Sequence, residues 1–434
     1  MAVSSTEELL LEPPRDGSPE SETPELDRSL RRLESFLRLF GFCQYLALGF
    51  SLSWLCFIAV GIAVPVLVIE FYLCFDLSNC EKYEVKKFEL EILICEAIAA
   101  AISLLCISHN LRKYGVRKFL FVDRYHGGLL RFRDAYIKKI NEFFRLLAIL
   151  GLPCFILKTS QEVVRVIYLN HEPLWKSMVA SFALLVSWAY LTTIYLSGTL
   201  LFNLICNLQV IHFENYGKLL ERDLDVSVYI EEHMRLTYYL SKISHRFRIF
   251  LLLEFLVVTA SQFLALLETT GNQGIINFIN GADFAVLSIV QVVGIIVCLQ
   301  AATKITHKAQ GLASIASRWH ALVTSSSTDT SQLGTSTNGG NMEHADLSVP
   351  ITISYSESDI EATDYVPTPT NLQLVSYMSS YHKRQAFVMY MLSNTGGVTI
   401  FGWTIDRALL NTIFFVEMSL VAFVLGKTIS FSTK

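Results

Sequence analysis

The chain has 434 residues, of which 52% are hydrophobic and only 17% charged, and its formal net charge is −4 at pH 7. Because an ordinary soluble domain carries about 25% charged residues, this composition excludes a soluble globular protein and predicts an all-α polytopic membrane protein. It gives no support to a nucleic-acid partner and makes membrane lipid the first expected partner.

Residues 1–40 are predicted to form a disordered cytoplasmic tail. Their first part, which contains PPRDGSPESETPE, is rich in Ser, Glu and Pro and lacks the apolar residues of a packed core. No apolar segment of signal type follows a basic start, so the first span must serve as the targeting element.

Seven apolar runs follow, each long enough to cross the roughly 30 Å hydrocarbon core as a helix of about 20 residues. They cover residues 45–75, 88–108, 146–169, 178–208, 249–267, 284–302 and 408–429. The first six are predicted to form a membrane bundle within residues 41–303. The seventh makes residues 408–434 a last helix with an outer tail.

A polar segment separates the sixth and seventh spans. Residues 304–371 are predicted to be a cytoplasmic low-complexity loop, because TSSSTDTSQLGTSTNGGN is too polar to pack a core. Helix-compatible residues then resume, so residues 372–407 are expected to hold a cytoplasmic helix, over 372–392, and a connection to the last span. A half-inserted eighth span is the alternative for that helix.

Lys and Arg gather on alternate connections, and the positive-inside rule places such connections in the cytoplasm. Four lie close before the first span, ten in 109–145, six in 209–248 and five in 304–385, whereas 76–87, 170–177 and 268–283 hold three, one and none. The prediction is a cytoplasmic amino terminus and an extracellular carboxyl terminus. A G-protein-coupled receptor would have its amino terminus outside.

Catalytic signatures are missing from the chain: it has no P-loop, metal-type Cys pair, HExxH or GxSxG. The chain is therefore not expected to be an enzyme, and no catalytic residue, metal site or cofactor is predicted. Cys74 and Cys80 lie close enough across an outer loop to form a disulfide, or they are two free thiols.

Polar residues within the spans are costly in hydrocarbon and usually face the protein interior or water. In the predicted topology they converge on the outer leaflet, where Asp283 and Glu268 end their spans. The candidate ligand pocket is built from Glu96, Lys158, Gln161, Glu162, Arg165, Trp188, Tyr190 and Gln262. Lys158 with Glu162, and Gln161 with Arg165, are i,i+4 neighbours on one helix. The alternative is a set of structural ion pairs near the headgroups.

The last helix carries its own stripe, Ile413, Glu417, Leu420, Val424 and Lys427, at helical spacing. If several copies surrounded an axis, this stripe would line a pore, with Leu420 and Val424 as a constriction that gates by dewetting and Glu417 favouring cations. The alternative is a helix face packed within one subunit, with Glu417 bonded to a hydroxyl or an Arg.

With these features the chain resembles an insect gustatory receptor. That family ends in Thr-Tyr, five hydrophobic residues and Gln-Phe, and this chain lacks the motif; the best register sets Ser419 and Leu420 over Thr-Tyr and Gly426 and Lys427 over Gln-Phe. The runs SSYHKRQAFVMYM and GGVTIFGWTIDRALLNTIFFVEMSLVAFVLGKT look like the carbon dioxide receptor lineage within the family.

The resemblance implies a homo- or hetero-tetrameric, ligand-gated, non-selective cation channel in the plasma membrane of a sensory neuron. Its last helices would surround the pore, and its outer pocket would take a small-molecule ligand. Four copies of Lys427 would repel cations, which mixing with related subunits would relieve. A site for carbon dioxide, or the bicarbonate that it yields, should present cations such as Lys158 or Arg165.

Two other classes of function stay open. A seven-span receptor that couples to G proteins requires the opposite orientation, and a secondary transporter normally has internal repeats, which this chain lacks.

Overall fold

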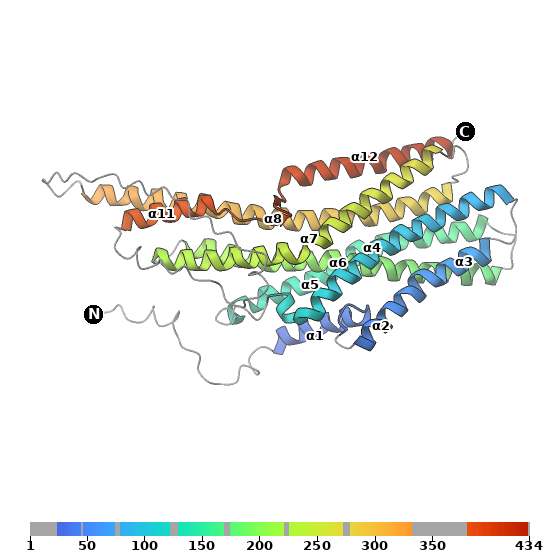
Figure 1. Cartoon of the computed structure of the whole chain (residues 1–434), viewed down its shortest axis with the longest axis horizontal. Helices are drawn as coiled ribbons and strands as arrows, with labels where there is room; N and C mark the ends of the chain where they lie inside the picture. The colour runs from blue at the N-terminus through green and yellow to red at the C-terminus, as the bar shows by residue number, and fades with distance from the viewer. Residues whose placement is uncertain are drawn as a thin grey trace.

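The computed structural model describes residues 24–44, 47–73, 79–121, 129–168, 174–220, 225–271, 278–331 and 380–432. Its elements are α1 (Pro24–Leu39), α2 (Ala47–Cys56), the π-helix η1 (Phe57–Ala63), α3 (Val64–Leu73), α4 (Asn79–Phe119), α5 (Leu129–Tyr168), α6 (Leu174–Leu219), α7 (Val226–Gly271), α8 (Phe278–Ser331), α11 (Ser380–Ser393), β1 (Thr399–Ile400), β2 (Trp403–Thr404) and α12 (Arg407–Ser432). Apart from one small hairpin, the described residues form a bundle of helices that run along its long axis (Figure 1). The predicted helical architecture is confirmed.

Five helices are much longer than a membrane is thick. α4 to α8 have between 40 and 54 residues, and α4 has a kink near its end at Gly115, where φ is +71°. An unbroken helix of 40 to 54 residues is about 60 to 80 Å long at 1.5 Å per residue. Among the described residues, six helical segments are long and apolar enough to cross a bilayer: Leu48–Glu70, Glu89–Phe119, Phe132–Ile167, Trp175–Leu219, Val226–Leu264 and Asp283–Ser325. The protein is thus a multi-pass membrane protein whose helices continue beyond the hydrocarbon core. The predicted seventh span falls on α12 and stays a prediction.

The first span joins α2, η1 and α3, because Pro65 interrupts its hydrogen-bond ladder. Proline lacks an N–H, and its ring crowds the carbonyl four residues earlier, here that of Gly61. The wider turn of η1 relieves this crowding, and Ser187 Oγ of α6 donates to Gly61 O at 3.5 Å. A Cβ on Gly61 would lie 2.7 Å from Leu191 Cδ2, so glycine lets α6 approach the first span.

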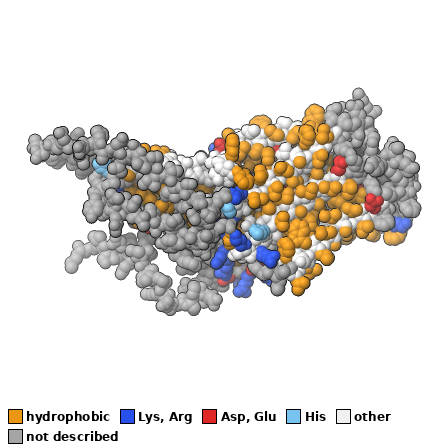
Figure 2. All heavy atoms as spheres, in the orientation of Figure 1, with side chains coloured by type: hydrophobic (Ala, Val, Ile, Leu, Met, Phe, Trp, Pro, Cys, Tyr) orange, Lys and Arg blue, Asp and Glu red, His pale blue; other side chains and the backbone are white. Residues whose placement is uncertain are grey.

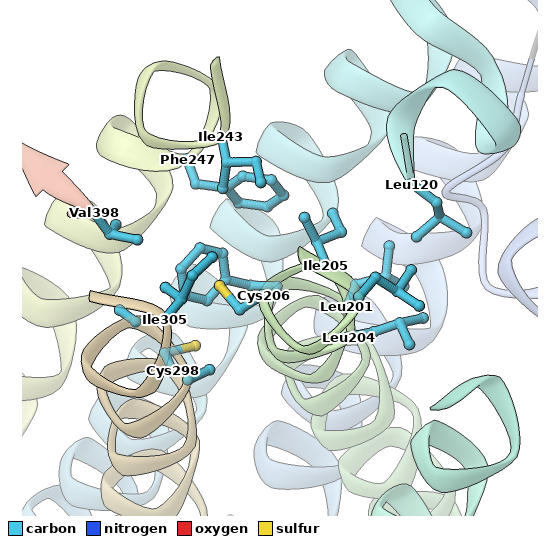
Figure 3. Packing of buried hydrophobic residues seen from close by; sticks show 14 of the residues in the cluster. Leu120, Leu201, Leu204, Ile205, Cys206, Ile243, Phe247, Cys298, Ile305 and Val398 are labelled. Carbon is cyan, nitrogen blue, oxygen red and sulfur yellow. The ribbon is translucent and has the colours of Figure 1, made fainter. Parts of the chain in front are cut away.

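α6 is the central helix and contacts α3, α4, α5, α7 and α8. Figure 3 shows Leu201, Leu204 and Ile205 of α6 among buried side chains of neighbouring helices, such as Phe247 of α7 and Ile305 of α8. Lipid is as apolar as leucine, so close van der Waals packing holds helices together inside the membrane. The central position of α6 therefore fixes the spacing of the helices around it.

The predicted disordered tail over residues 1–40 is wrong for its second part, which is the helix α1. Leu26, Leu30, Leu33 and Leu37 recur at helical spacing and are at most 4% exposed. They pack α1 on α5 and α4, and Arg117 of α4 forms an ion pair with the first turn of α1 at 2.6 Å. This leucine period outweighs the polar composition that suggested disorder. Residues 1–23 lie outside the described residues.

The predicted loop at 304–371 is also wrong at its start, because α8 continues to Ser331. Ile305, Ala309, Leu312 and Ala316 are buried at helical spacing and extend the apolar face of the sixth span. Residues 332–379 lie outside the described residues. α11 overlaps the predicted 372–392 helix but begins at Ser380 and ends one residue later, at Ser393, and it packs on α8 and α7.

A tight hairpin joins α11 to α12. Ile400 pairs with Trp403, and the two turn residues between them, Phe401 and Gly402, both have positive φ, +48° and +88°; this is the pattern of a two-residue hairpin turn that follows the strand twist. Val398, just before β1, is fully buried, and its N–H donates to Thr306 Oγ1 of α8 at 3.1 Å. The start of α12 is therefore tied to α8.

Apolar side chains cover much of the described surface (Figure 2). Figure 2 shows a broad apolar surface over one half, with Lys and Arg side chains gathered along one edge of it. Exposed apolar residues of the spanning helices include Leu52, Ile98, Leu152, Phe182 and Leu256. Lipid-facing side chains are expected to be apolar, and basic residues at one border are typical of a cytoplasmic edge.

Candidate functional site

A small cavity lies between α3, α4, α5, α6 and α8. Its volume is about 60 Å³, room for several water molecules. Its lining consists of Pro65, Ile69, Glu89, Ile92, Leu93, Glu96, Lys158, Glu162, Arg165, Leu184, Ser187, Trp188, Asp283 and Leu287. One part of this wall is apolar and the other is charged, which is the composition of a small-molecule site.

Five of the lining residues form an ion network centred on Asp283. Lys158 Nζ and Arg165 Nη2 both donate to the Asp283 carboxylate. Lys158 lies 3.2 Å from Glu162 Oε1, and Arg165 lies 3.4 Å from the same oxygen and 3.1 Å from Glu89 Oε1. Each of the five residues is less than 9% exposed. Pairing of this kind is what makes charge tolerable at membrane depth.

The spacing of α5 explains why its charges meet. Lys158, Glu162 and Arg165 lie at i, i+4 and i+7 and therefore share one face of the helix. Leu157 and Val163, which point the other way, are about half exposed, at 48% and 53%, as expected for side chains that face lipid. α5 is thus divided into a charged inner face and an apolar outer face.

Five of the eight predicted pocket residues line this one cavity: Glu96, Lys158, Glu162, Arg165 and Trp188. The other three lie elsewhere. Gln161 stands beside the network and hydrogen-bonds Asp283. Tyr190 stacks on Phe40, with ring centroids 6.2 Å apart, and Gln262 accepts a hydrogen bond from a serine of α8 at 3.2 Å.

Sequence reasoning missed the roles of Asp283 and Glu89. Asp283 was one of several polar residues at span ends, and Glu89 stood in an acidic start of the second run. The charges on the inner face of α5 would have indicated them, because two positive residues, Lys158 and Arg165, share that face with only one negative residue, Glu162. A second anion had to come from another helix.

A second, smaller cavity of about 10 Å³ adjoins the first and shares Glu96, Trp188 and Leu287 with it. Gln291 of α8 also lines this cavity, and its Oε1 accepts a hydrogen bond from Ser261 Oγ of α7 at 2.5 Å. The wall of the cavities is therefore hydrogen-bonded to α7.

The same stretch of α7 holds α12. Thr259 Oγ1 donates to Glu417 Oε1 at 2.8 Å, and Glu417 is 1% exposed. Ile413 and Leu420 are partly buried, and the side chains of residues 424 and 427 lie outside the described residues. Within one subunit the predicted pore stripe thus packs against its own bundle through a hydroxyl, one of the two arrangements expected for it. The pore assignment itself stays a prediction.

Residues 28–416 match the family described as "Protein of unknown function (DUF3537)". The chain belongs to this family. No curated protein sequence matches this DUF3537 protein. Its structure resembles that of the insect olfactory receptor OR5 from Machilis hrabei, solved in complex with eugenol (TM-score 0.52, 12% identity) and in a second structure (TM-score 0.52, 11% identity). Each comparison covers 92% of this chain and 98% of the receptor chain.

At such identity the likeness establishes the fold. This DUF3537 protein has the fold of an insect olfactory receptor, so the resemblance to insect chemoreceptors that its sequence suggested is confirmed at the level of fold. The carbon dioxide lineage stays a prediction. Cys74 lies outside the described residues, so both alternatives for it and Cys80 stay open.

Proposed function

We propose that this DUF3537 protein is a chemosensory receptor that acts as a subunit of a ligand-gated, non-selective cation channel. The observation that carries the proposal is the part-apolar, part-charged cavity, set in a fold that OR5 uses in a structure solved with eugenol. Apolar walls with convergent polar groups are the features that small-molecule sites share. The ligand pocket is therefore assigned to this cavity.

Coupling to α12 follows from the contacts of α7. A ligand against Trp188 and Leu287 presses on the wall that continues to Gln291, and Gln291 is bonded to α7 through Ser261. α7 in turn holds α12 through Thr259. A ligand that binds one arrangement of these helices more tightly shifts the population towards it.

The pore is proposed to form where the α12 helices of four subunits meet. The face of α12 that its own bundle leaves uncovered is mainly apolar: Phe415 and Phe423 are 69% and 50% exposed, with Ser419 exposed between them. Facing an axis, such side chains would exclude water and close the path by dewetting. Opening would then require α12 to turn, release Glu417 from Thr259 and bring the carboxylate towards the axis.

The finer assignments are part of the same proposal. The protein is proposed to lie in the plasma membrane with its amino terminus inside, which the distribution of Lys and Arg supports. It is also proposed to act as a gustatory receptor of the carbon dioxide lineage, which the runs at 379–391 and 396–428 support. Currents evoked by carbon dioxide from this chain, alone and with related subunits, test the lineage. If carbon dioxide evokes no current, the assignment to that lineage is refuted, but the proposal of a ligand-gated channel is unaffected.

The decisive experiment combines topology and current. An epitope fused after Lys434 should be stained on intact cells, and one before Met1 only after permeabilisation. Whole-cell recordings should then show ligand-evoked cation currents during application of a panel of small organic compounds. Leu287→Trp, which fills the cavity, should abolish the response.

Leu105→Trp is the matched control, because Leu105 is 51% exposed and does not line the cavity. This variant should respond as the wild type does. Equal responses of L287W and wild type would remove the cavity from the mechanism. Staining of the amino-terminal epitope on intact cells would favour a receptor coupled to G proteins.

A further inference from the structure

We propose that the cavity selects a small organic cation, a protonated amine with a short apolar body. The inference rests on the proposed function, since it names the chemical class of ligand that the same cavity takes. It is drawn from the charge balance of the lining.

The lining holds more carboxylates than cations. Among the described side chains that face the cavity, two cations, Lys158 and Arg165, stand against four carboxylates, those of Glu89, Glu96, Glu162 and Asp283. A buried carboxylate without a matching positive charge is costly. The carboxylates exceed the cations by two, so a ligand with one positive charge can pair with one of them, and the other can take up a proton.

Glu96 and Glu162 are the carboxylates best placed to receive that charge. Glu96 is 8% exposed, and the hydrogen bond to its Oε1 comes from Thr192 Oγ1 at 3.0 Å, a neutral donor. Glu162 is 3% exposed; both its oxygens lack a partner in hydrogen-bond geometry, despite the ion-pair distances to Lys158 and Arg165. Both side chains line the cavity and can accept hydrogen bonds from an ammonium group.

The rest of the wall suits the body of an amine rather than a metal ion. Trp188 offers an aromatic face for a cation–π contact, and Leu184 and Leu287 offer apolar contact. No group of three or more His, Cys, Asp or Glu suited to a metal ion occurs in the part of the chain that the structure describes. An organic cation meets both halves of this lining.

An anion such as bicarbonate fits the lining less well, so membership of the carbon dioxide lineage would not by itself make carbon dioxide or bicarbonate the ligand of this cavity. The two cations expected to receive it, Lys158 and Arg165, already donate to Asp283, and Arg165 is also paired with Glu89. An incoming anion would have to displace a carboxylate from a buried pair, and it would add to the negative excess.

The test uses three probes with the same four-carbon chain and different charge: butylamine, 1-butanol and butyrate. Each is titrated against the purified full-length protein in lipid nanodiscs at pH 7, and the rise of the thermal unfolding midpoint gives the affinity. Butylamine should bind at least tenfold more tightly than either other probe. Glu96→Gln should weaken butylamine at least tenfold, the usual effect of losing a charged hydrogen bond, and leave 1-butanol unchanged.

Glu254→Gln is the matched control, because Glu254 is also a buried glutamate, accepts a hydrogen bond from Ser103 at 2.7 Å, and does not line the cavity. It should bind butylamine as the wild type does. If 1-butanol or butyrate binds as tightly as butylamine and Trp188→Ala abolishes that binding, the preference for a cation is refuted and the cavity remains the binding site. If none of the three probes binds, or W188A leaves all binding intact, the cavity is not the site and the proposed function loses its pocket as well.

Discussion

Replacing Asp283 by Asn should destabilise the protein strongly, because this carboxylate is the only one to which both cations of the ion network donate among the described hydrogen bonds. Removing one partner of a buried ion pair costs about 3 to 5 kcal/mol. Lys158 would keep Glu162, and Arg165 would keep Glu89 and Glu162, so the lower end applies. A loss of about 3 kcal/mol is a factor of roughly 150 in the unfolding equilibrium.

The assay is equilibrium unfolding in mixed micelles of rising SDS content, followed by tryptophan fluorescence. Asp134→Asn is the matched control: Asp134 pairs with Arg133 at 3.2 Å, but its side chain is 86% exposed, and exposed pairs contribute about 0 to 1 kcal/mol. The double variant Lys158→Met with D283N should lose less than the sum of the single losses, because the two residues are in contact. Equal stability of D283N and D134N would refute the view that the network holds the helices together.

Two further predictions concern α12 and α1. Thr259→Val should reduce stability by about 1 to 3 kcal/mol, since it leaves a buried carboxylate oxygen of Glu417 without its donor, and it should shift the ligand dose response. Thr412→Val, at an exposed threonine bonded to its own helix, is the control and should change neither stability nor dose response. Identical dose responses of both variants would show that the Thr259–Glu417 contact has no part in gating. Burial raises the pKa of the Cys43 thiol to about 12, which leaves a thiolate fraction of about one in ten thousand at pH 8. Cys43 should therefore resist alkylation by iodoacetamide in the intact protein. In Leu33→Asp, which releases α1, it should react at least tenfold faster, as measured by mass spectrometry. Equal rates of alkylation in the two proteins would show that α1 does not shield Cys43.

The apolar runs predicted the membrane helices well, because hydropathy depends on composition and needs no knowledge of neighbours. Where those helices end was harder to predict. α8 continues to Ser331, and this extension buries small residues such as Ala309 and Ala316. Such residues are not hydrophobic enough to be detected by a search for strongly hydrophobic segments. α1 was missed for a related reason: its four leucines form an amphipathic face in a polar context, and such a helix depends on a partner surface for its stability.

Residues of the candidate site that lie close together on one helix could be predicted from the sequence, whereas those that come from distant parts of the chain could not. Lys158, Glu162 and Arg165 share a helix face, so their spacing alone brings them together. Asp283 lies 118 residues beyond Arg165, and only the packing of α8 against α5 makes it their shared partner. Tyr190 does not line the cavity, although it lies only two positions from Trp188. It points to a different face of α6, where it stacks on Phe40.

The contacts between the cavity and α12 also bear on how many subunits must act together. The Ser261–Gln291 and Thr259–Glu417 hydrogen bonds contribute about 1 to 3 kcal/mol as a pair. Moving an equilibrium from 1% to 99% open requires about 5.5 kcal/mol of differential binding, so these two bonds cannot switch a single subunit. Four subunits moving together would combine about 4 to 12 kcal/mol, which brackets the requirement. If the channel is the proposed tetramer, these bonds can carry gating only when the subunits open in concert, and the dose response should then be steep, with a Hill coefficient well above 1.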